Sequence, residues 1–240
     1  MKKPTNELRR YYGYFDRELH ENILPYWMKY GVEKNGHGFH GAVDLDGNPV
    51  LSANKSCVLN ARILWTFSAA AMPEGNSGYA EMADRAWRVV TGDFEDREFG
   101  GYYMELSPDN QVASDLKHTY VQAFVLYAFC KYYEFRRQEP VLQKIRELFE
   151  LLEEKAKDPV NIGYRESFTR DWEVYSENRM ADHNEPKSMN SHLHILEAWA
   201  ALYKVWKDPR GRPGLRKCFT YSWIRSSARM VIWEFFSMIH

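Results

Sequence analysis

The 240-residue sequence predicts an all-α protein of the (α/α)6-barrel type, in which inner and outer helices alternate around a ring. Three segments, residues 55–71, 115–136 and 187–205, are apolar on nearly every side, which indicates burial on more than one face. The segments between them, 79–91 and 140–155, are amphipathic and fit an outer layer. Since the sequence supplies only three helix pairs, we expect about the first half of the ring, with short β-hairpins between the pairs.

The remaining elements follow from periodicity and turn chemistry. Apolar residues recur mostly every three or four positions over residues 7–30, which predicts a helix with one apolar face. Pro25 should kink or end that helix, because proline has no amide hydrogen and clashes with the preceding turn. Residues 34–50 and 99–112 carry Asn-Gly, Asp-Gly and Gly-Gly pairs, which are typical of tight β-hairpins. Residues 164–184 are predicted to form a loop.

A lysine stands at the start of each predicted inner helix, and the three lysines recur at nearly even intervals. The three segments are Lys55–Arg62, Lys117–Tyr120 and Lys187–Asn190. A spacing of this kind is typical of a structure built from repeated units.

Composition excludes several classes of protein. The 32 Lys and Arg nearly balance the 33 Asp and Glu, for a net charge of −1, which gives no electrostatic basis for a nucleic-acid or anionic-membrane partner. The three cysteines form no Cys-x-x-Cys pair, so neither a metal site nor a disulfide framework is predicted. The sequence lacks a membrane-length apolar run and a signal-peptide core. We therefore expect a soluble, cytoplasmic protein.

The C-terminal residues 211–240 differ in character from residues 1–210, which form the predicted half-ring domain. They are rich in Arg and Lys, with Glu234 as the one acid, and show no sustained helical or strand period. One interpretation is a basic extension. The other is out-of-frame translation, since reading from the last base of the Lys217 codon can yield an amphipathic helix, a Pro-Asp-Gly turn and a strand-like end.

The last inner helix carries a polar stripe. Asn190, His194 and Glu197 stand at i, i+4 and i+7, hence on one face of an otherwise apolar helix. A satisfied core network would explain the stripe, because buried polar groups need hydrogen bonds. The functional alternative is a site that binds sugar hydroxyls and moves protons, because histidine titrates near neutrality. His192 points elsewhere, so a His-x-His zinc pair is not predicted.

Two further candidates lie on the other inner helices. Arg62, inside an apolar segment, must either pair with a carboxylate such as Glu197 or bind a ligand oxygen through its fork of donors. Tyr120 shares a face with Phe124 and Tyr127, a stripe that suits a core as well as a binding site.

Several blocks of sequence resemble the N-acylglucosamine 2-epimerase superfamily, and most of all its cellobiose 2-epimerase branch. The resemblance covers roughly residues 8–208, about the first half of a complete member. It rests on HGFHGAVDLDG, K-x-x-x-L-N-A-R-I-L-W-T-F-S, FGGYYMELSPDN, KHTYVQAFVLYAFCKYY, GYRESFTRDW and KSMNSHLHILEAWAALYKVW.

The resemblance implies an (α/α)6 barrel and, without a cofactor, reversible epimerisation at C2 of the reducing-end glucose of cellobiose and related β-1,4-disaccharides. The sugar ring opens, and two histidines exchange the C2 proton through a cis-enediolate. Arg62, Tyr120 and Asn190 match substrate-binding positions, and His194 matches the histidine suited to ring opening. The two proton-exchanging histidines belong to the second half of the family's chain and have no match here, so we expect little activity.

Two alternatives remain open at this point. The first is another activity of the same superfamily, an N-acylglucosamine 2-epimerase or an aldose–ketose isomerase. The second is a non-catalytic carbohydrate-binding module that keeps the sugar-binding side chains.

Overall fold

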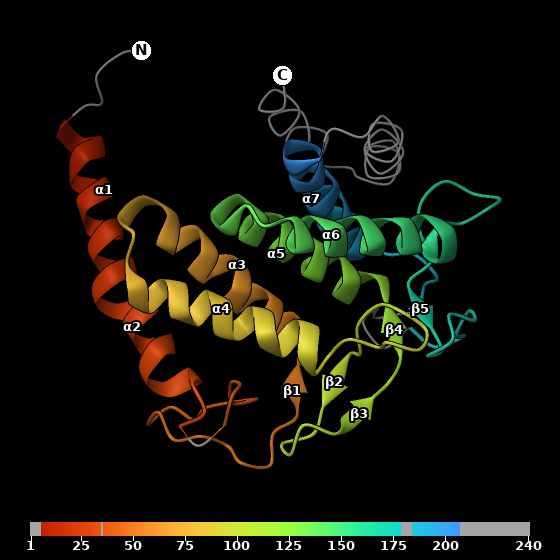
Figure 1. Ribbon diagram of the computed structural model, residues 1–240, viewed down its shortest axis with the longest axis horizontal. Helices are drawn as coiled ribbons and strands as arrows, with labels where there is room; N and C mark the ends of the chain where they lie inside the picture. The colour runs from red at the N-terminus through yellow and green to blue at the C-terminus, as the bar shows by residue number, and fades with distance from the viewer. Residues whose placement is uncertain (1–5, 35, 179–183, 207–240) are drawn as a thin grey trace.

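The computed structural model describes residues 6–34, 36–178 and 184–206 (Figure 1). The predicted non-family segment 211–240 lies outside the described residues. Helices dominate the fold, as predicted, and the strands are only two or three residues long.

The N-terminal helix is continuous in helical residues from 6 to 31. It consists of α1 (Asn6–Arg17), η1 (Glu18–Ile23), α2 (Leu24–Tyr26) and η2 (Trp27–Gly31). The prediction that the helix could end at Pro25 is wrong. Wider π-helical turns lie on both sides of this proline, and proline and π-helical turns are both recognised sites of helix bending.

Five helices follow in the predicted alternation. The inner helices are α3 (Cys57–Glu74), α5 (Thr119–Arg136) and α7 (Met189–Val205). The outer helices are α4 (Ser77–Gly92) and α6 (Glu139–Leu151), which continues into the π-helical turn η3 (Leu152–Ala156). Helix α5 lies between α3 and α7, α4 packs on α3, and α6 packs on α5 (Figure 1).

Helix α5 begins four residues later than predicted. Lys117 and His118 form strand β4 (Lys117–His118), which pairs antiparallel with β5 (Ser167–Phe168) inside the predicted loop. The His118 side chain caps the helix, because its Nδ1 accepts a hydrogen bond from the amide of Tyr120 at 3.2 Å. The apolar pattern extends through the helix, but the backbone pairing sets its first residue.

A second small sheet joins the entry to α3 with the next hairpin. Its strands are β1 (Lys55–Ser56), β2 (Glu105–Leu106) and β3 (Val112–Ser114), in antiparallel order. Each of the first two inner helices is thus preceded by a strand that pairs with the hairpin of the following unit, which fixes where those helices begin.

Three hairpins, which follow the N-terminal helix, α4 and α6, are built alike. In each, a residue just after the helix forms an antiparallel bridge with an aromatic residue seven positions later. The pairs are Val32 with Phe39, Glu95 with Tyr102 and Lys157 with Tyr164. All three aromatic side chains are buried and preceded by glycine.

The repeated lysines bind these hairpins. Lys55 pairs with Glu33 at 2.5 Å, Lys117 with Asp96 at 2.9 Å, and Lys187 with Asp158 at 2.6 Å. Each acid stands one residue after the first bridge partner of its hairpin. The lysine spacing in the sequence therefore marks three equivalent hairpin–inner-helix units.

The middle ion pair is the most deeply buried. Neither Lys117 nor Asp96 has an exposed side chain, and Arg170 also donates to Asp96. Burial by itself raises the pKa of Asp96, but the hydrogen bonds from Arg170 and Lys117 more than offset it and hold the pKa well below its usual range.

A buried polar side chain five residues after the lysine supports the hairpin in two units. Gln122 exchanges two hydrogen bonds with the backbone of Tyr102. His192 accepts from the amide of Tyr164 through Nε2, while its Nδ1 donates to the carbonyl of Ser188. His192 is thus a satisfied core histidine, which agrees with the prediction that it points away from the stripe.

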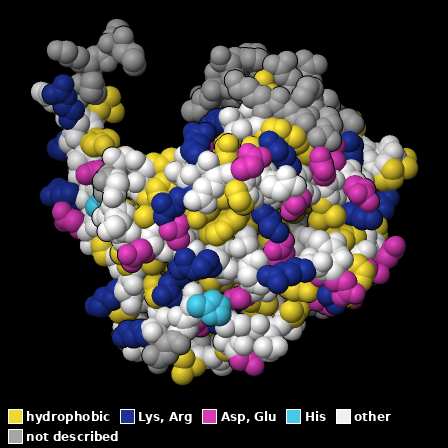
Figure 2. Space-filling view, in the orientation of Figure 1, with side chains coloured by type: hydrophobic (Ala, Val, Ile, Leu, Met, Phe, Trp, Pro, Cys, Tyr) yellow, Lys and Arg dark blue, Asp and Glu magenta, His cyan; other side chains and the backbone are white. Residues whose placement is uncertain are grey.

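The predicted apolar face of the N-terminal helix is exposed. No residue of α1 is buried, and Leu8, Tyr12 and Phe15 are each more than half exposed. Hydrophobic side chains accordingly lie along this projecting helix in Figure 2. Burial begins only at Leu24, so among the described residues this helix joins the core near its C-terminal end.

Candidate functional site

The inner helices present a wall of side chains at matching positions of the three units. Seven residues after each lysine stand Arg62 on α3, Phe124 on α5 and His194 on α7. The Arg62 guanidinium lies over the Phe124 ring at 4.7 Å, and the ring centres of Phe124 and His194 are 4.4 Å apart. One row of contacts thus crosses all three helices.

A second row lies one turn further along the helices, ten residues after each lysine. Trp65 stacks on Tyr127, with ring centres 5.5 Å apart, and Glu197 completes the row. Burial raises the pKa of Tyr127, and the negative charge of Glu197 raises it further. Tyr127 and Glu197 also line a hollow of about 180 Å³ between α5 and α7.

Tyr120 and Asn190 occupy the second position of their helices, three residues after the lysine. Tyr120 is 9% exposed and meets the His194 ring edge-on, with ring centres 5.0 Å apart. Asn190 is exposed, one turn before His194 on the same helix. The structure therefore brings Arg62, Tyr120 and His194 into one contact cluster and places Asn190 at its margin.

The charged residues do not pair as the core alternative supposed. Among the described residues, the Glu197 carboxylate is bonded to His194, with Oε2 2.8 Å from Nδ1, and forms no ion pair with Arg62. The Arg62 side chain is exposed. This leaves the N–H donors at the edge of the guanidinium available to an oxygen-rich ligand while the face of the group lies over Phe124.

Two buried residues that the sequence did not single out hold the site helices together. The Glu166 carboxylate accepts from the amide of Ser188, which caps α7, and from the side-chain amide of Asn178. Asn178 in turn accepts from Nε2 of His118, the cap of α5. This network links the first turns of α5 and α7, and so sets Tyr120 relative to His194. Its members are far apart in the sequence, and no local spacing marks them.

The electrostatic setting suits a ligand that develops negative charge on oxygen. Tyr120 and Asn190 lie in the first turn of α5 and α7, and Arg62 lies in the second turn of α3. The N-terminal turns of helices carry partial positive charge, which favours anions close to the first turn. The cluster therefore offers hydroxyl, amide and guanidinium donors beside an imidazole able to exchange a proton.

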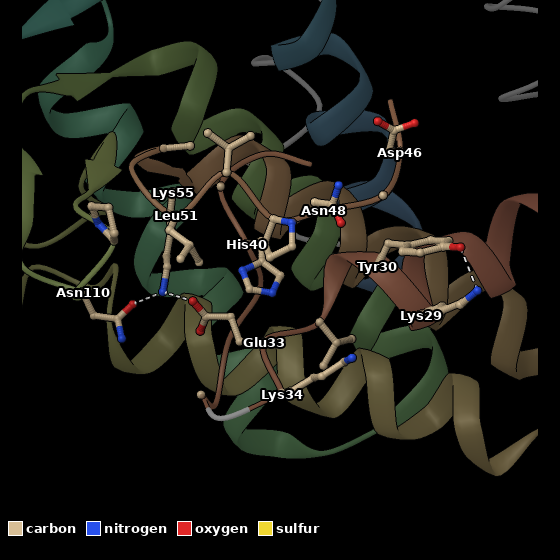
Figure 3. A pocket seen from close by; sticks show the side chains of 18 residues that line it. Lys29, Tyr30, Glu33, Lys34, His40, Asp46, Asn48, Leu51, Lys55 and Asn110 are labelled. Atoms are coloured by element: carbon tan, nitrogen blue, oxygen red, sulfur yellow. Dashed lines mark hydrogen bonds and ion pairs between the residues drawn. The ribbon is translucent and has the colours of Figure 1, made fainter. Parts of the chain in front are cut away.

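A larger hollow of about 710 Å³ lies elsewhere, among the residues of the first hairpin (Figure 3). None of the four predicted site residues lines it. Its buried cation, Lys55, is already engaged by Glu33 and by the side chain of Asn110 at 2.7 Å. These contacts join two hairpins, so we assign this region to the framework of the fold.

Two further observations concern the described residues alone. None of their helices is long and apolar enough to cross a bilayer. Their His, Cys, Asp and Glu side chains form no group of three arranged to hold a metal ion.

Fold and site together define a half-ring of paired helices whose inner face carries a polar and aromatic cluster. The family model described as N-acylglucosamine 2-epimerase matches residues 38–239. The chain belongs to this family.

Cellobiose 2-epimerases are among the curated relatives of this chain. The one from Bacteroides fragilis is 39% identical over 196 residues, which cover 81% of this chain and 50% of that protein. The one from Ruminococcus albus is 33% identical over 191 residues, covering 79% and 48%. The chain thus spans about half the length of the curated relatives it matches.

Solved structures agree with the fold. The cellobiose 2-epimerase of Spirochaeta thermophila superposes with a TM-score of 0.84 at 33% identity, over 92% of this chain and 56% of that one. A D-mannose isomerase superposes with a TM-score of 0.73 at 18% identity, over 86% and 50%, and shares the fold alone. Partial coverage of these relatives fits the half-ring predicted from the sequence.

Proposed function

We propose that this chain forms the sugar-binding and ring-opening part of a carbohydrate 2-epimerase site, acting on the reducing-end glucose of cellobiose and related β-1,4-disaccharides. The observation that carries the proposal is the contact row Arg62–Phe124–His194, because it gathers a cation, an aromatic face and an imidazole from three helices. The names of the relatives at 39% and 33% identity support the substrate class.

In this proposal His194 catalyses ring opening. The imidazole takes the proton of the C1 hydroxyl as the C1–O5 bond breaks and a carbonyl forms at C1, and it returns that proton to the ring oxygen. Arg62, Tyr120 and Asn190 bind sugar oxygens. Epimerisation then requires the exchange of the C2 proton through a cis-enediolate, which the family resemblance assigns to two histidines unmatched in this chain. The proposed partner is the disaccharide alone, with neither cofactor nor nucleic acid.

Mutarotation of cellobiose tests the ring-opening step, because interconversion of its anomers requires the ring to open and does not require loss of the C2 proton. We expect the chain to accelerate mutarotation, measured by NMR exchange spectroscopy, and His194→Asn to abolish the acceleration. General acid–base catalysis by a positioned group contributes about 10²–10⁴-fold. An unchanged mutarotation rate from folded, sugar-bound protein would contradict the proposal and favour a binding module.

Proton–deuterium exchange at C2, followed in heavy water, tests the epimerisation step separately. For this chain alone we expect no exchange. Exchange with a mannose-type product would mean that residues of this chain replace the unmatched histidines. A ketose product would instead favour an aldose–ketose isomerase of the same superfamily.

We also propose that residues 211–240 are translated out of frame. Two observations support this interpretation: these residues show no helical or strand period, and translation in the shifted frame can yield an amphipathic helix, a turn and a strand-like end. The family match, however, continues to residue 239 and so includes most of the segment. Sequencing the gene beside intact relatives provides the test, and the absence of an insertion or deletion would contradict the proposal.

A further inference from the structure

The imidazole of His194 is held on three sides. Tyr120 meets it edge-on, with ring centres 5.0 Å apart, and Phe124 lies at 4.4 Å with its plane tilted by 40°. Glu197, one helical turn further on, places Oε2 2.8 Å from Nδ1. The side chain of His194 is nevertheless 23% exposed, so part of the ring remains open to a ligand.

The two ring nitrogens are therefore not equivalent. Nδ1 is occupied by the Glu197 carboxylate, which can only accept a hydrogen bond when ionised. The neutral imidazole must then carry its proton on Nδ1, and the lone pair falls on Nε2. Among the described residues, no side chain or backbone group bonds to Nε2. Nε2 is the nitrogen left to take a proton from a ligand.

Among the described residues, Glu197 forms its ion pair with His194 and with no lysine or arginine. Lys131 of the facing helix, which lines the same hollow, is paired with Glu134. In the equivalent position of the other two units stand Trp65 and Tyr127, which stack on each other. Only the unit that carries a histidine in the row above also carries a carboxylate here.

We propose that Glu197 is a positioning residue that fixes the tautomer and orientation of His194 and so directs Nε2 toward the sugar. The proposal deepens the proposed function and rests on it for the identity of the ligand. Glu197 touches the histidine and not the sugar, so its effect passes through the imidazole. A carboxylate hydrogen-bonded to a histidine in this way fixes the tautomer and the orientation of the ring.

Nitrogen-15 NMR of the imidazole rings in the full chain tests the proposal directly. The spectra are recorded about two pH units above the ordinary histidine pKa of ~6.5, and the His194 signal is assigned with His194→Asn. We expect His194 of the wild type to be the Nδ1–H tautomer. In Glu197→Ala the Nδ1–H population should fall toward that of an unconstrained imidazole, and Glu197→Met, which keeps the side-chain volume, should behave alike.

The controls separate positioning from folding. His192, whose tautomer is fixed by Ser188 and Tyr164, should keep its signal in every folded variant. Glu154→Ala removes an exposed carboxylate, paired with Lys155, that does not line the hollow beside Glu197, and it should leave His194 unchanged. An Nδ1–H tautomer that persists in both Glu197 variants would overturn the proposal.

The mutarotation rate then separates the two proposals. If the wild type accelerates mutarotation, Glu197→Ala should reduce the rate while cellobiose affinity changes less than threefold, since Glu197 does not bind the sugar. If the wild type does not accelerate mutarotation, the proposed function fails, whereas the tautomer result still decides whether Glu197 positions His194.

Discussion

The inner helices and the N-terminal helix both carry apolar and aromatic residues at helical spacing, yet these residues are buried to very different extents. In α5, twelve of the eighteen residues are buried, including four of its seven aromatic side chains. In α1, none of the twelve residues is buried, although five of them are tyrosine, phenylalanine or leucine. The difference lies in what surrounds each helix and cannot be read from its own pattern.

The inner helices are enclosed because an outer helix packs on each of them or a hairpin is bonded to it. The lysine before α5 binds Asp96 in the hairpin after α4, and Gln122 bonds to the same hairpin. The N-terminal helix has no such enclosure over α1 within the described residues. A periodic apolar face thus predicts a helix and its inward side, whereas burial depends on neighbours that the local pattern does not specify.

Truncating one aromatic residue in each region gives the largest expected contrast. Phe129 of α5 is fully buried, with its ring centre 4.7 Å from that of Trp87, so Phe129→Ala should lower the free energy of unfolding by about 3–5 kcal/mol. Tyr12 of α1 is 73% exposed, and Tyr12→Ala should change it by less than about 0.5 kcal/mol. Urea denaturation measures both. A cost at Tyr12 comparable to that at Phe129 would show that α1 is covered in solution.

Removing the lysine of the middle ion pair, Lys117–Asp96, should have the next largest effect on the free energy of unfolding. Lys117→Met leaves Asp96 buried with Arg170 as its remaining cation, and removing one partner of a buried pair costs about 3–5 kcal/mol. We expect the lower end of that range because Arg170 remains. The matched change Lys155→Met removes a lysine from an exposed pair with Glu154 and should cost less than about 1 kcal/mol. Equal effects of the two changes on stability in urea would contradict a stabilising role of the buried Lys117–Asp96 pair.

Much of the fold could be predicted because its signals are local or repeated. All-round apolarity marks the inner helices, and the lysine before each of them marks a repeated unit. The start of α5 at Thr119 could not be predicted, since it is set by pairing with Ser167 and Phe168, which lie far along the chain. The passage of the N-terminal helix through Pro25 could not be predicted for another reason: it involves π-helical turns on both sides of the proline, which leave no mark in hydrophobic periodicity.

The candidate site was predicted in its residues but only partly in its contacts. The helical spacing of Asn190, His194 and Glu197 placed them on one face, and the His194–Glu197 hydrogen bond follows from that spacing. The cluster with Arg62 and Tyr120 depends on how α3, α5 and α7 pack, which no single helix encodes. Roles in sugar binding and ring opening remain predictions.

Replacing one arginine in each region tests whether cellobiose binds at the inner helices and not at the N-terminal helix. Arg62 and Arg10 are both exposed and each lies over an aromatic ring, at 4.7 Å from Phe124 and 5.5 Å from Tyr11. Arg62→Met should weaken cellobiose binding roughly tenfold or more, since a hydrogen bond to a charged group contributes about 1.5–3 kcal/mol. Arg10→Met should leave the affinity unchanged. Titration followed by saturation-transfer NMR measures both, and equal affinities would remove Arg62 from the site.

The smallest expected effect is a pH dependence of the free energy of unfolding, which arises from two buried histidines. Burial lowers the pKa of His118 and of His192, and each neutral ring accepts a backbone amide, that of Tyr120 and that of Tyr164 respectively. Because the folded pKa values lie below the ordinary value of ~6.5, the unfolded chain takes up more protons as the pH falls through that value. The free energy of unfolding should therefore decrease from pH 7.5 to pH 5.5.

His118→Asn tests how much of this pH dependence comes from the titrating ring of His118. Asparagine is a good N-cap acceptor without a titrating ring, so it can replace the bond to the Tyr120 amide, a cap that is typically worth about 1 kcal/mol. We expect thermal unfolding of this variant to show a smaller loss of stability between pH 7.5 and pH 5.5 than the wild type, while His192 preserves the rest of the slope. An identical change of stability with pH in the two proteins would mean that protonation of His118 does not open the first turn of α5. The loss of stability at low pH would then arise from other groups.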